Sequence, residues 1–278
     1  MRTLCGKFHR KFVVYYIHLI VVLGMVGCTS NPFSDNNIQR QNSTISGKVE
    51  LRDGGSSEGV YVWLEGFNIG TSVNESGEFQ LTVPPKDSQG STGGISSVFD
   101  LYFFLANYKL ASAQVVTQNG EFLYSRGEIN KDGRLSPAKV LTRMLRISTK
   151  VTPASFRQNY AGTIDVEVSL EAIDEAMTVV FPNTIPGRLG AIFIRNVATK
   201  EVFVFAAYPG NTLVDEVTIG SFEHKRSLSF SLLTFRLPAA RYEVIPYLLV
   251  IREDVPVELL DSLGSGITAL NPNYLKMP

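Results

Sequence analysis

The stretch Thr163-Ile164-Asp165-Val166-Glu167-Val168-Ser169-Leu170 alternates polar and apolar side chains along its whole length. Because successive side chains of a strand point to opposite faces of a sheet, this alternation predicts a β-strand with one buried face. Shorter apolar or alternating runs follow it at close spacing, at residues 178–181, 191–194, 201–205, 227–230 and 242–247. This number and spacing of strands predicts an immunoglobulin-like β-sandwich over residues 146–256.

The preceding hundred residues show the same character. Residues 46–51 and 78–83 alternate polar and apolar side chains, and residues 59–64 form a β-branched and aromatic run. Asp53-Gly54-Gly55 and Asn74-Glu75-Ser76-Gly77 separate these runs and are strong turn signals. We therefore predict antiparallel strands in a first β-sandwich over residues 45–145, and an all-β fold of two sandwiches for the chain.

This first region resembles the carboxypeptidase regulatory-like domain. Members begin with an Ile-x-Gly-x-Val strand, continue with Gly-Val-x-Val-x-Leu, and then form a hairpin of the pattern Thr-x-x-x-x-x-Gly-x-Phe-x-Leu. The matching residues are Ile45, Gly47 and Val49, then 59–64, then Thr71, Gly77, Phe79 and Leu81, with a later strand at Asn107-Tyr108-Lys109. The Gly/Ser-rich stretch from Pro84 to Ser97 departs from the pattern and is expected to be a long loop. The resemblance implies a transthyretin-like sandwich that binds or supports rather than catalyses.

The second region resembles the domain of intracellular proteinase inhibitors. The matching stretches are Val179-Val180-Phe181-Pro182, Ile194-Arg195-Asn196 and the Leu-Pro-x-x-x-Tyr-x-Val pattern of residues 237–244. These short patterns are common to many sandwiches. The resemblance implies the fold, and proteinase inhibition follows from it only as an alternative function.

The N-terminus has the features of a secretory signal. Arg2, Lys7, Arg10 and Lys11 precede an apolar run over residues 12–26, which is shorter than the roughly 20 residues that a transmembrane helix needs. The end of this run, Met25-Val26-Gly27-Cys28, resembles the lipobox of bacterial lipoproteins, with Met25 in the place where Leu is usual. The resemblance implies that residues 1–27 are removed as a signal peptide and that Cys28 carries the lipid that attaches the protein to a membrane.

The residues after Cys28 are polar. Residues 28–44 are rich in Asn, Ser and Gln and are expected to form a flexible linker behind the anchor. The resemblance then implies a location in the bacterial cell envelope. In a host with two membranes it favours the outer membrane, because Thr29 stands where an inner-membrane lipoprotein has Asp.

Composition argues against several functions. Without residues 1–27, Lys+Arg falls by four, from 26 to 22, against 26 Asp+Glu, and such a mildly acidic chain does not predict nucleic-acid binding. Cys28 and His224 would be the only Cys and His left, so we expect no metal site, no cofactor and no catalytic residues. His224 lies in Glu223-His224-Lys225-Arg226, and we expect it in an exposed loop.

Three groups of residues are candidate sites. Tyr61 and Trp63 share one strand face and would bind a ligand by stacking if that face is exposed, although aromatic residues more often fill sandwich cores. Residues 128–134 resemble a calcium loop in spacing, but Lys139 stands where the closing acid should be, so a plain turn is favoured. The acids that a hydrolase could use, Asp165, Glu167, Asp174 and Glu175, are expected on a solvated face.

Two segments leave alternatives open. Residues 136–150 fit either a short helix, with Pro137 at its first position, or a strand that enters the second sandwich. Residues 257–278 fit either a short helix or a loose tail.

Taken together, the sequence features predict that the chain is a lipid-anchored, non-catalytic envelope protein with a protein or polysaccharide partner. A proteinase inhibitor and a carboxylate-based hydrolase remain as alternatives.

Overall fold

The computed structural model of the chain describes residues 43–89, 94–123, 127–130, 132–157, 160–233 and 237–263. The described residues belong to one compact unit. Strands make up nearly all of the regular structure in the described ranges, which confirms the prediction of an all-β sandwich fold. Helical structure is limited there to the 3-10 turn η1 (Lys86–Ser88) and the helix α2 (Val257–Ser262).

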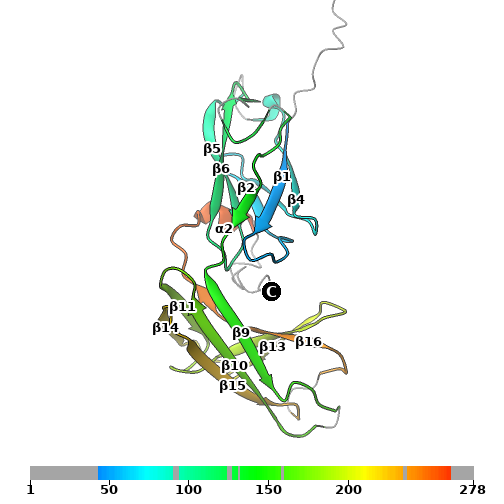
Figure 1. The fold of residues 1–278 in the computed structure, drawn as a ribbon, viewed down its shortest axis with the longest axis vertical. Helices are drawn as coiled ribbons and strands as arrows, with labels where there is room; N and C mark the ends of the chain where they lie inside the picture. Colours follow the sequence, from blue (N-terminus) through cyan, green and yellow to red (C-terminus); the bar gives the residue numbers. More distant parts are fainter. Residues whose placement is uncertain are drawn as a thin grey trace, which may run out of the picture. The chain divides into compact units, whose positions relative to one another are not determined.

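Two sheets form what we call the N-terminal sandwich, the described residues between 43 and 141 (Figure 1). The smaller sheet has the order β4-β1-β8 and consists of β1 (Thr44–Leu51), β4 (Glu78–Thr82) and β8 (Lys139–Leu141). The larger has the order β3-β2-β5-β6-β7 and consists of β2 (Tyr61–Leu64), β3 (Ile69–Ser72), β5 (Ser97–Phe104), β6 (Ala111–Gln118) and β7 (Glu121–Phe122). The pairing of β1 with β4 is antiparallel, as predicted, whereas β8 joins the other edge of β1 in parallel.

The two sheets bury one hydrophobic core between them. Ile45 and Val49 alternate along β1 and are fully buried, as are Val62 and Leu64 of β2. Phe103 of β5 lies in the same core. The period-two pattern of the sequence therefore places one face of each sheet in the interior.

The C-terminal sandwich, the described residues between 144 and 250, has a separate core. One sheet has the order β15-β10-β9 and consists of β9 (Leu145–Thr152), β10 (Thr163–Ala172) and β15 (His224–Ser231). The others have the orders β14-β11-β17 and β13-β12-β16 and consist of β11 (Met177–Pro182), β12 (Ala191–Asn196), β13 (Val202–Ala206), β14 (Val214–Ile219), β16 (Tyr242–Pro246) and β17 (Leu249–Val250). The segment from β16 to β17 links these last two sheets, because its first part pairs with β12 and its end pairs with β11.

Strand β10 contains the alternating polar and apolar residues 163–170. Val166, Val168 and Leu170 are fully buried in the core, while Asp165 on the same strand is exposed. Residues 136–150 contain β8 and β9, so the strand alternative holds for this segment and the helix alternative is wrong. The segment after residue 256 begins with the short helix α2.

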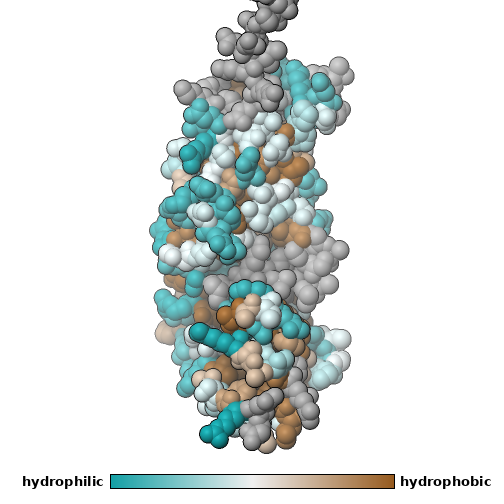
Figure 2. All heavy atoms as spheres, turned by 90° about the vertical axis from the view of Figure 1, so that its right-hand side faces the viewer, coloured by the Kyte–Doolittle hydropathy of each residue, from teal (hydrophilic) through white to brown (hydrophobic). Residues whose placement is uncertain are grey.

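Large apolar side chains are also found at the surface. Val204, Leu213 and Phe222 are more than half exposed. On the face drawn in Figure 2, hydrophobic residues occur as separate groups between hydrophilic ones.

Candidate functional site

The second face of the larger N-terminal sheet is aromatic. Neighbouring strands β2 and β5 pair antiparallel, which places Tyr61 opposite Phe104 and Trp63 opposite Tyr102. These four side chains lie on the sheet face opposite the core residues Val62, Leu64, Leu101 and Phe103. We call Tyr61, Trp63, Tyr102 and Phe104 the aromatic face. Cross-strand pairs of this kind stabilise a sheet when they are packed, and aromatic rings also offer a flat surface for a ligand.

Trp63 is the centre of the aromatic face. Its ring stacks on Tyr102 with centroids 5.9 Å apart and an angle of 27° between the planes. Its indole N–H donates a hydrogen bond of 3.0 Å to the side chain of Asn68, so the polar atom of the ring has a partner although the residue is only 2 % exposed. Burial and the nearby Glu65 and Asp100 carboxylates raise the pKa of the Tyr102 hydroxyl.

Helix α2 and the turn before it cover this face. Val255 and Leu259 are buried in one cluster with Trp63 and Phe104. Leu260 and Leu263 pack against the same cluster (α2 is drawn in salmon in Figure 1). The shared strand face of Tyr61 and Trp63 was predicted correctly, but an exposed stacking pair is not what the structure shows, since the C-terminal segment lies over the indole ring. Ligand binding by this pair stays a prediction.

Strand β3 leaves room for the ring of Tyr61. Gly70 pairs with Trp63 across the β2–β3 ladder, and a Cβ atom at Gly70 would collide with the Tyr61 ring. The glycine thus allows Tyr61 to lie across the neighbouring strand, where it packs at the edge of the aromatic cluster.

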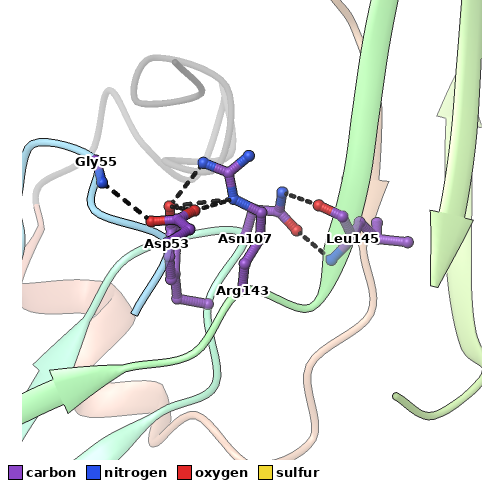
Figure 3. A network of polar contacts seen from close by, with 6 residues as sticks. Asp53, Gly55, Asn107, Arg143 and Leu145 are labelled. Atoms are coloured by element: carbon purple, nitrogen blue, oxygen red, sulfur yellow. Dashed lines mark hydrogen bonds and ion pairs between the residues drawn. The ribbon is translucent and has the colours of Figure 1, made fainter. Parts of the chain in front are cut away.

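A polar network joins the loop after β1 to the segment between β8 and β9 (Figure 3). The guanidinium group of Arg143 lies 2.7 Å from a carboxylate oxygen of Asp53 and donates hydrogen bonds to the hydroxyl of Tyr108. That hydroxyl donates in turn to Asp53 at 3.0 Å. Although burial acts to raise it, hydrogen bonds from the Gly55 N–H and from Tyr108, and the charge of Arg143, hold the pKa of Asp53 below its ordinary value.

Asn107 and Arg252 form further side-chain hydrogen bonds to the backbone in the same region. The buried amide of Asn107 donates to the carbonyl of Leu145 and accepts from its N–H. Arg252 donates from Nη1 to the carbonyl of Tyr108 at 2.8 Å and pairs with Asp254 through two further bonds of 2.7 Å. Asn107 therefore holds the start of β9 in place, and Arg252 holds the connection between β5 and β6.

A second charged cluster lies in the C-terminal sandwich. Arg226 of β15 is 8 % exposed, pairs with Asp215 of β14 at 2.8 Å, and lies with its guanidinium carbon 5.0 Å from the centre of the Phe181 ring. Asp215 also accepts a hydrogen bond of 3.0 Å from the N–H of Gly187. The buried arginine is therefore neutralised by a carboxylate that β14, a strand of another sheet, supplies.

The expectation of an exposed loop for His224 is wrong. The residue begins β15, its ring lies beside Phe181, and its Nε2 atom is buried without a hydrogen-bond partner among the described residues. Burial first, and then the charge of Arg226, lower the pKa of His224. The charged neighbours of His224 in the sequence predicted a loop, but the charge of Arg226 is neutralised by Asp215, which lies on another strand.

The acids considered for a hydrolase are surface groups. Asp165 accepts a hydrogen bond from Ser229, Glu167 pairs with Lys225 at 3.2 Å, and both acids point to the outer side of β10. Asp174 pairs with Lys109 at 3.1 Å, and Glu175 is exposed. The prediction of a solvated face is confirmed for Asp165 and Glu167.

The loop considered for calcium is closed by its own residues. Lys139, at the position of the closing ligand, forms an ion pair of 2.6 Å with Glu128, at the position of the first ligand. The side-chain oxygen of Asn130 accepts hydrogen bonds from the N–H groups of Asp132 and Arg134. Both contacts are typical of a turn. Within the described ranges no group of three or more His, Cys, Asp or Glu side chains is placed to hold a metal ion.

Cys28, the predicted lipid site, lies outside the described residues, as do residues 1–27 and most of the predicted linker. None of the helices in the described part of the chain is long and apolar enough to span a membrane.

Comparisons with protein-family models, with curated proteins and with solved structures found no match.

Proposed function

We propose that this chain is a lipid-anchored, non-catalytic protein of the bacterial cell envelope that binds a protein or polysaccharide partner through its β-sandwiches. Cys28 would carry the lipid after removal of residues 1–27, and residues 28–44 would hold the folded part away from the bilayer. The N-terminal sandwich would be a transthyretin-like module of the carboxypeptidase regulatory-like kind, and the C-terminal one an immunoglobulin-like module. In a host with two membranes, Thr29 favours the outer membrane.

One observation supports binding over catalysis more than any other. The two carboxylates that come closest to forming a catalytic group are each held in an ion pair with an arginine. Asp53 pairs with Arg143, and Asp215 pairs with Arg226. The aromatic face, by contrast, is supplied by two adjacent strands and leaves Tyr61 and Tyr102 partly exposed beside the segment that covers Trp63. Partly exposed tyrosine side chains at the edge of an apolar cluster are typical of recognition sites.

The anchor is tested by labelling cells with an alkyne fatty acid. We expect the wild-type protein to take up the label and to sediment with membranes, and the Cys28→Ser variant to lose both properties. Cys5→Ser is the matched control, because Cys5 lies in the predicted signal peptide and its loss should change neither. Equal membrane association of the wild-type and Cys28→Ser proteins would contradict the anchor.

The binding function is tested on the protein without its lipid. Capture of one envelope component in repeated pull-downs, without turnover of glycosides or esters, is the expected result. Slowing of a serine protease would instead support the inhibitor alternative, and hydrolysis of a glycoside would support the carboxylate alternative. Either result would replace the proposal.

A further inference from the structure

We infer that residues 251–263, which we call the C-terminal clasp, join the two sandwiches into one cooperative folding unit by returning the chain from the C-terminal sandwich to the N-terminal one. The inference goes beyond the proposed function. It depends neither on lipidation of Cys28 nor on the presence of a partner, so it and the proposed function fail separately.

Within the described residues, the chain passes between the two sandwiches twice. The first passage is residues 142–144, between the end of β8 and the start of β9. The second begins after β17, which pairs with β11 of the C-terminal sandwich, and it ends where Val255 joins the cluster of Trp63 and Phe104. Two sandwiches joined by one short linker are free to move against each other, and a second passage restricts this motion.

The apolar end of the clasp covers large side chains that lie outside the N-terminal core. Trp63 and Phe104 belong to the aromatic face, on the other side of the sheet from that core. Beneath Val255 and Leu259 they are only 2 % and 4 % exposed. Because removal of apolar surface from water is the main favourable contribution to folding, the N-terminal sandwich depends for part of its stability on a segment that arrives from the other sandwich.

The polar end of the clasp is held by Arg252. Its side chain is only 8 % exposed, and Asp254 neutralises its charge through two bonds of 2.7 Å. The same guanidinium group donates to the carbonyl of Tyr108 at 2.8 Å. Asn107, the residue before Tyr108, bonds the backbone of Leu145 after the first passage. One connection of the N-terminal sandwich, between β5 and β6, therefore holds both passages of the chain.

A surface ion pair also joins the two sandwiches. Lys109 and Asp174 lie 3.1 Å apart, and their side chains are 46 % and 49 % exposed. Exposed ion pairs of this kind contribute little to stability, because water and salt screen the two charges. The buried contacts of the clasp are therefore a stronger means of coupling than this pair.

The clasp can cover the aromatic face only while the C-terminal sandwich is folded. Helix α2 has six residues and no side-chain hydrogen bond at its N-cap, and a helix of this length is not stable by itself in water. In the folded protein β17 holds the clasp beside the aromatic face. When the C-terminal sandwich unfolds, residues 145–250 become a long flexible loop, and closing that loop costs conformational entropy. Unfolding of the second sandwich should therefore uncover Trp63 and destabilise the first.

Trp63 makes the coupling measurable, because it is the single tryptophan of the chain and lies in the N-terminal sandwich. Val168→Ala, a change in the core of the C-terminal sandwich, should lower the urea midpoint of Trp63 fluorescence. In the full-length Leu259→Asp protein, whose new carboxylate cannot stay buried against the rings, the shift caused by Val168→Ala should fall to less than about half. Val257→Asp is the matched control: Val257 is 66 % exposed on the same helix, so the shift should keep its full size.

Two results would overturn the inference. A Trp63 midpoint that Val168→Ala leaves unchanged in the otherwise wild-type protein would show that the sandwiches unfold independently. A shift of the same size in the Leu259→Asp protein would show that the coupling runs through residues 142–145 and not through the clasp. Circular dichroism without urea shows whether Leu259→Asp keeps its β-structure. If it does not, Arg252→Gln, which weakens the polar end of the clasp, takes its place with the same expected and contrary outcomes.

Discussion

The side chain of Asn107 acts as a strand partner for the backbone of Leu145. Its Nδ2 donates to the Leu145 carbonyl at 2.7 Å, and its Oδ1 accepts from the Leu145 N–H at 2.9 Å. The Asn107 N–H and carbonyl belong to the connection between β5 and β6, and its carbonyl also accepts from the N–H of Met144. One buried amide thus fastens the start of β9 to the N-terminal sandwich.

Replacing Asn107 by Ala should destabilise the protein clearly. The change leaves the N–H and the carbonyl of Leu145 buried without partners, and each unsatisfied group costs about 1–3 kcal/mol. We expect the free energy of unfolding to fall by roughly 2 kcal/mol or more, measured by urea denaturation. Gln118→Ala, an exposed change on β6, is the control and should lie within about 0.5 kcal/mol of wild type. Equal values for the two variants would show that the amide contributes little.

Removal of the Asp53 carboxylate should reduce the loss of stability in acid. Because the folded protein holds the pKa of Asp53 below its ordinary value of 3.8, the unfolded chain takes up a proton first as the pH falls. The stabilisation is therefore present above about pH 4 and is lost below it. In urea melts at pH 5 and pH 3 we expect Asp53→Asn to be less stable than wild type at pH 5, with the difference shrinking at pH 3. Asp87→Asn, at an exposed position, should not show this convergence.

Close packing explains why the Ile-x-Gly-x-Val strand has a glycine at residue 47. A Cβ atom at this position would come within 2.8 Å of both the Leu135 Cβ and the Phe79 ring. These neighbours are buried, so Gly47→Ala should cost about 1–3 kcal/mol of unfolding free energy through overpacking. Gly220→Ala is the matched control, because a Cβ atom there meets no other atom within 4 Å. A thermal melt in which both variants unfold at the wild-type temperature would refute this explanation.

The parts of the fold that could be read from the sequence are those with a local cause. Alternation along residues 163–170 places Val166 and Val168 in the core, and the same rule assigns Tyr61 and Trp63 to one face. Which side chains then cover that face is not a local property. Leu259 lies almost two hundred residues after Trp63, and no pattern near either residue predicts that the two side chains share a cluster.

The charged residues show the same limit. Arg143 and Asp53 are ninety residues apart in the chain, and the sequence around neither residue predicts that they form an ion pair. The charged neighbours of His224 in the sequence, Glu223, Lys225 and Arg226, predict an exposed loop. In the structure, strand alternation turns Arg226 inward, where Asp215 of another strand neutralises its charge. Pairings between distant strands decide the environment of such groups, and these pairings follow from the tertiary fold.

The environment of His224 leads to a prediction for mild acid. Burial and the charge of Arg226 lower the pKa of the imidazole from its ordinary value of 6.5, and the charge of Asp215 acts in the opposite direction. In the window between the lowered pKa and 6.5, the unfolded chain binds a proton that the folded protein does not, so stability falls as the pH drops through this window. Above 6.5 both states are neutral and the effect is absent.

Urea midpoints at pH 7.5 and pH 5 measure this effect. We expect His224→Gln to lose less stability than wild type between these two values, because glutamine keeps a planar polar group but does not titrate. Lys225→Gln is the control, since it removes an exposed charge from the neighbouring position of β15 and leaves the imidazole in place. A wild-type pH dependence that persists unchanged in His224→Gln would show that other groups cause it. A normal imidazole pKa, measured by NMR titration of the wild-type protein, would show that Arg226 and burial do not act on His224 as the structure indicates.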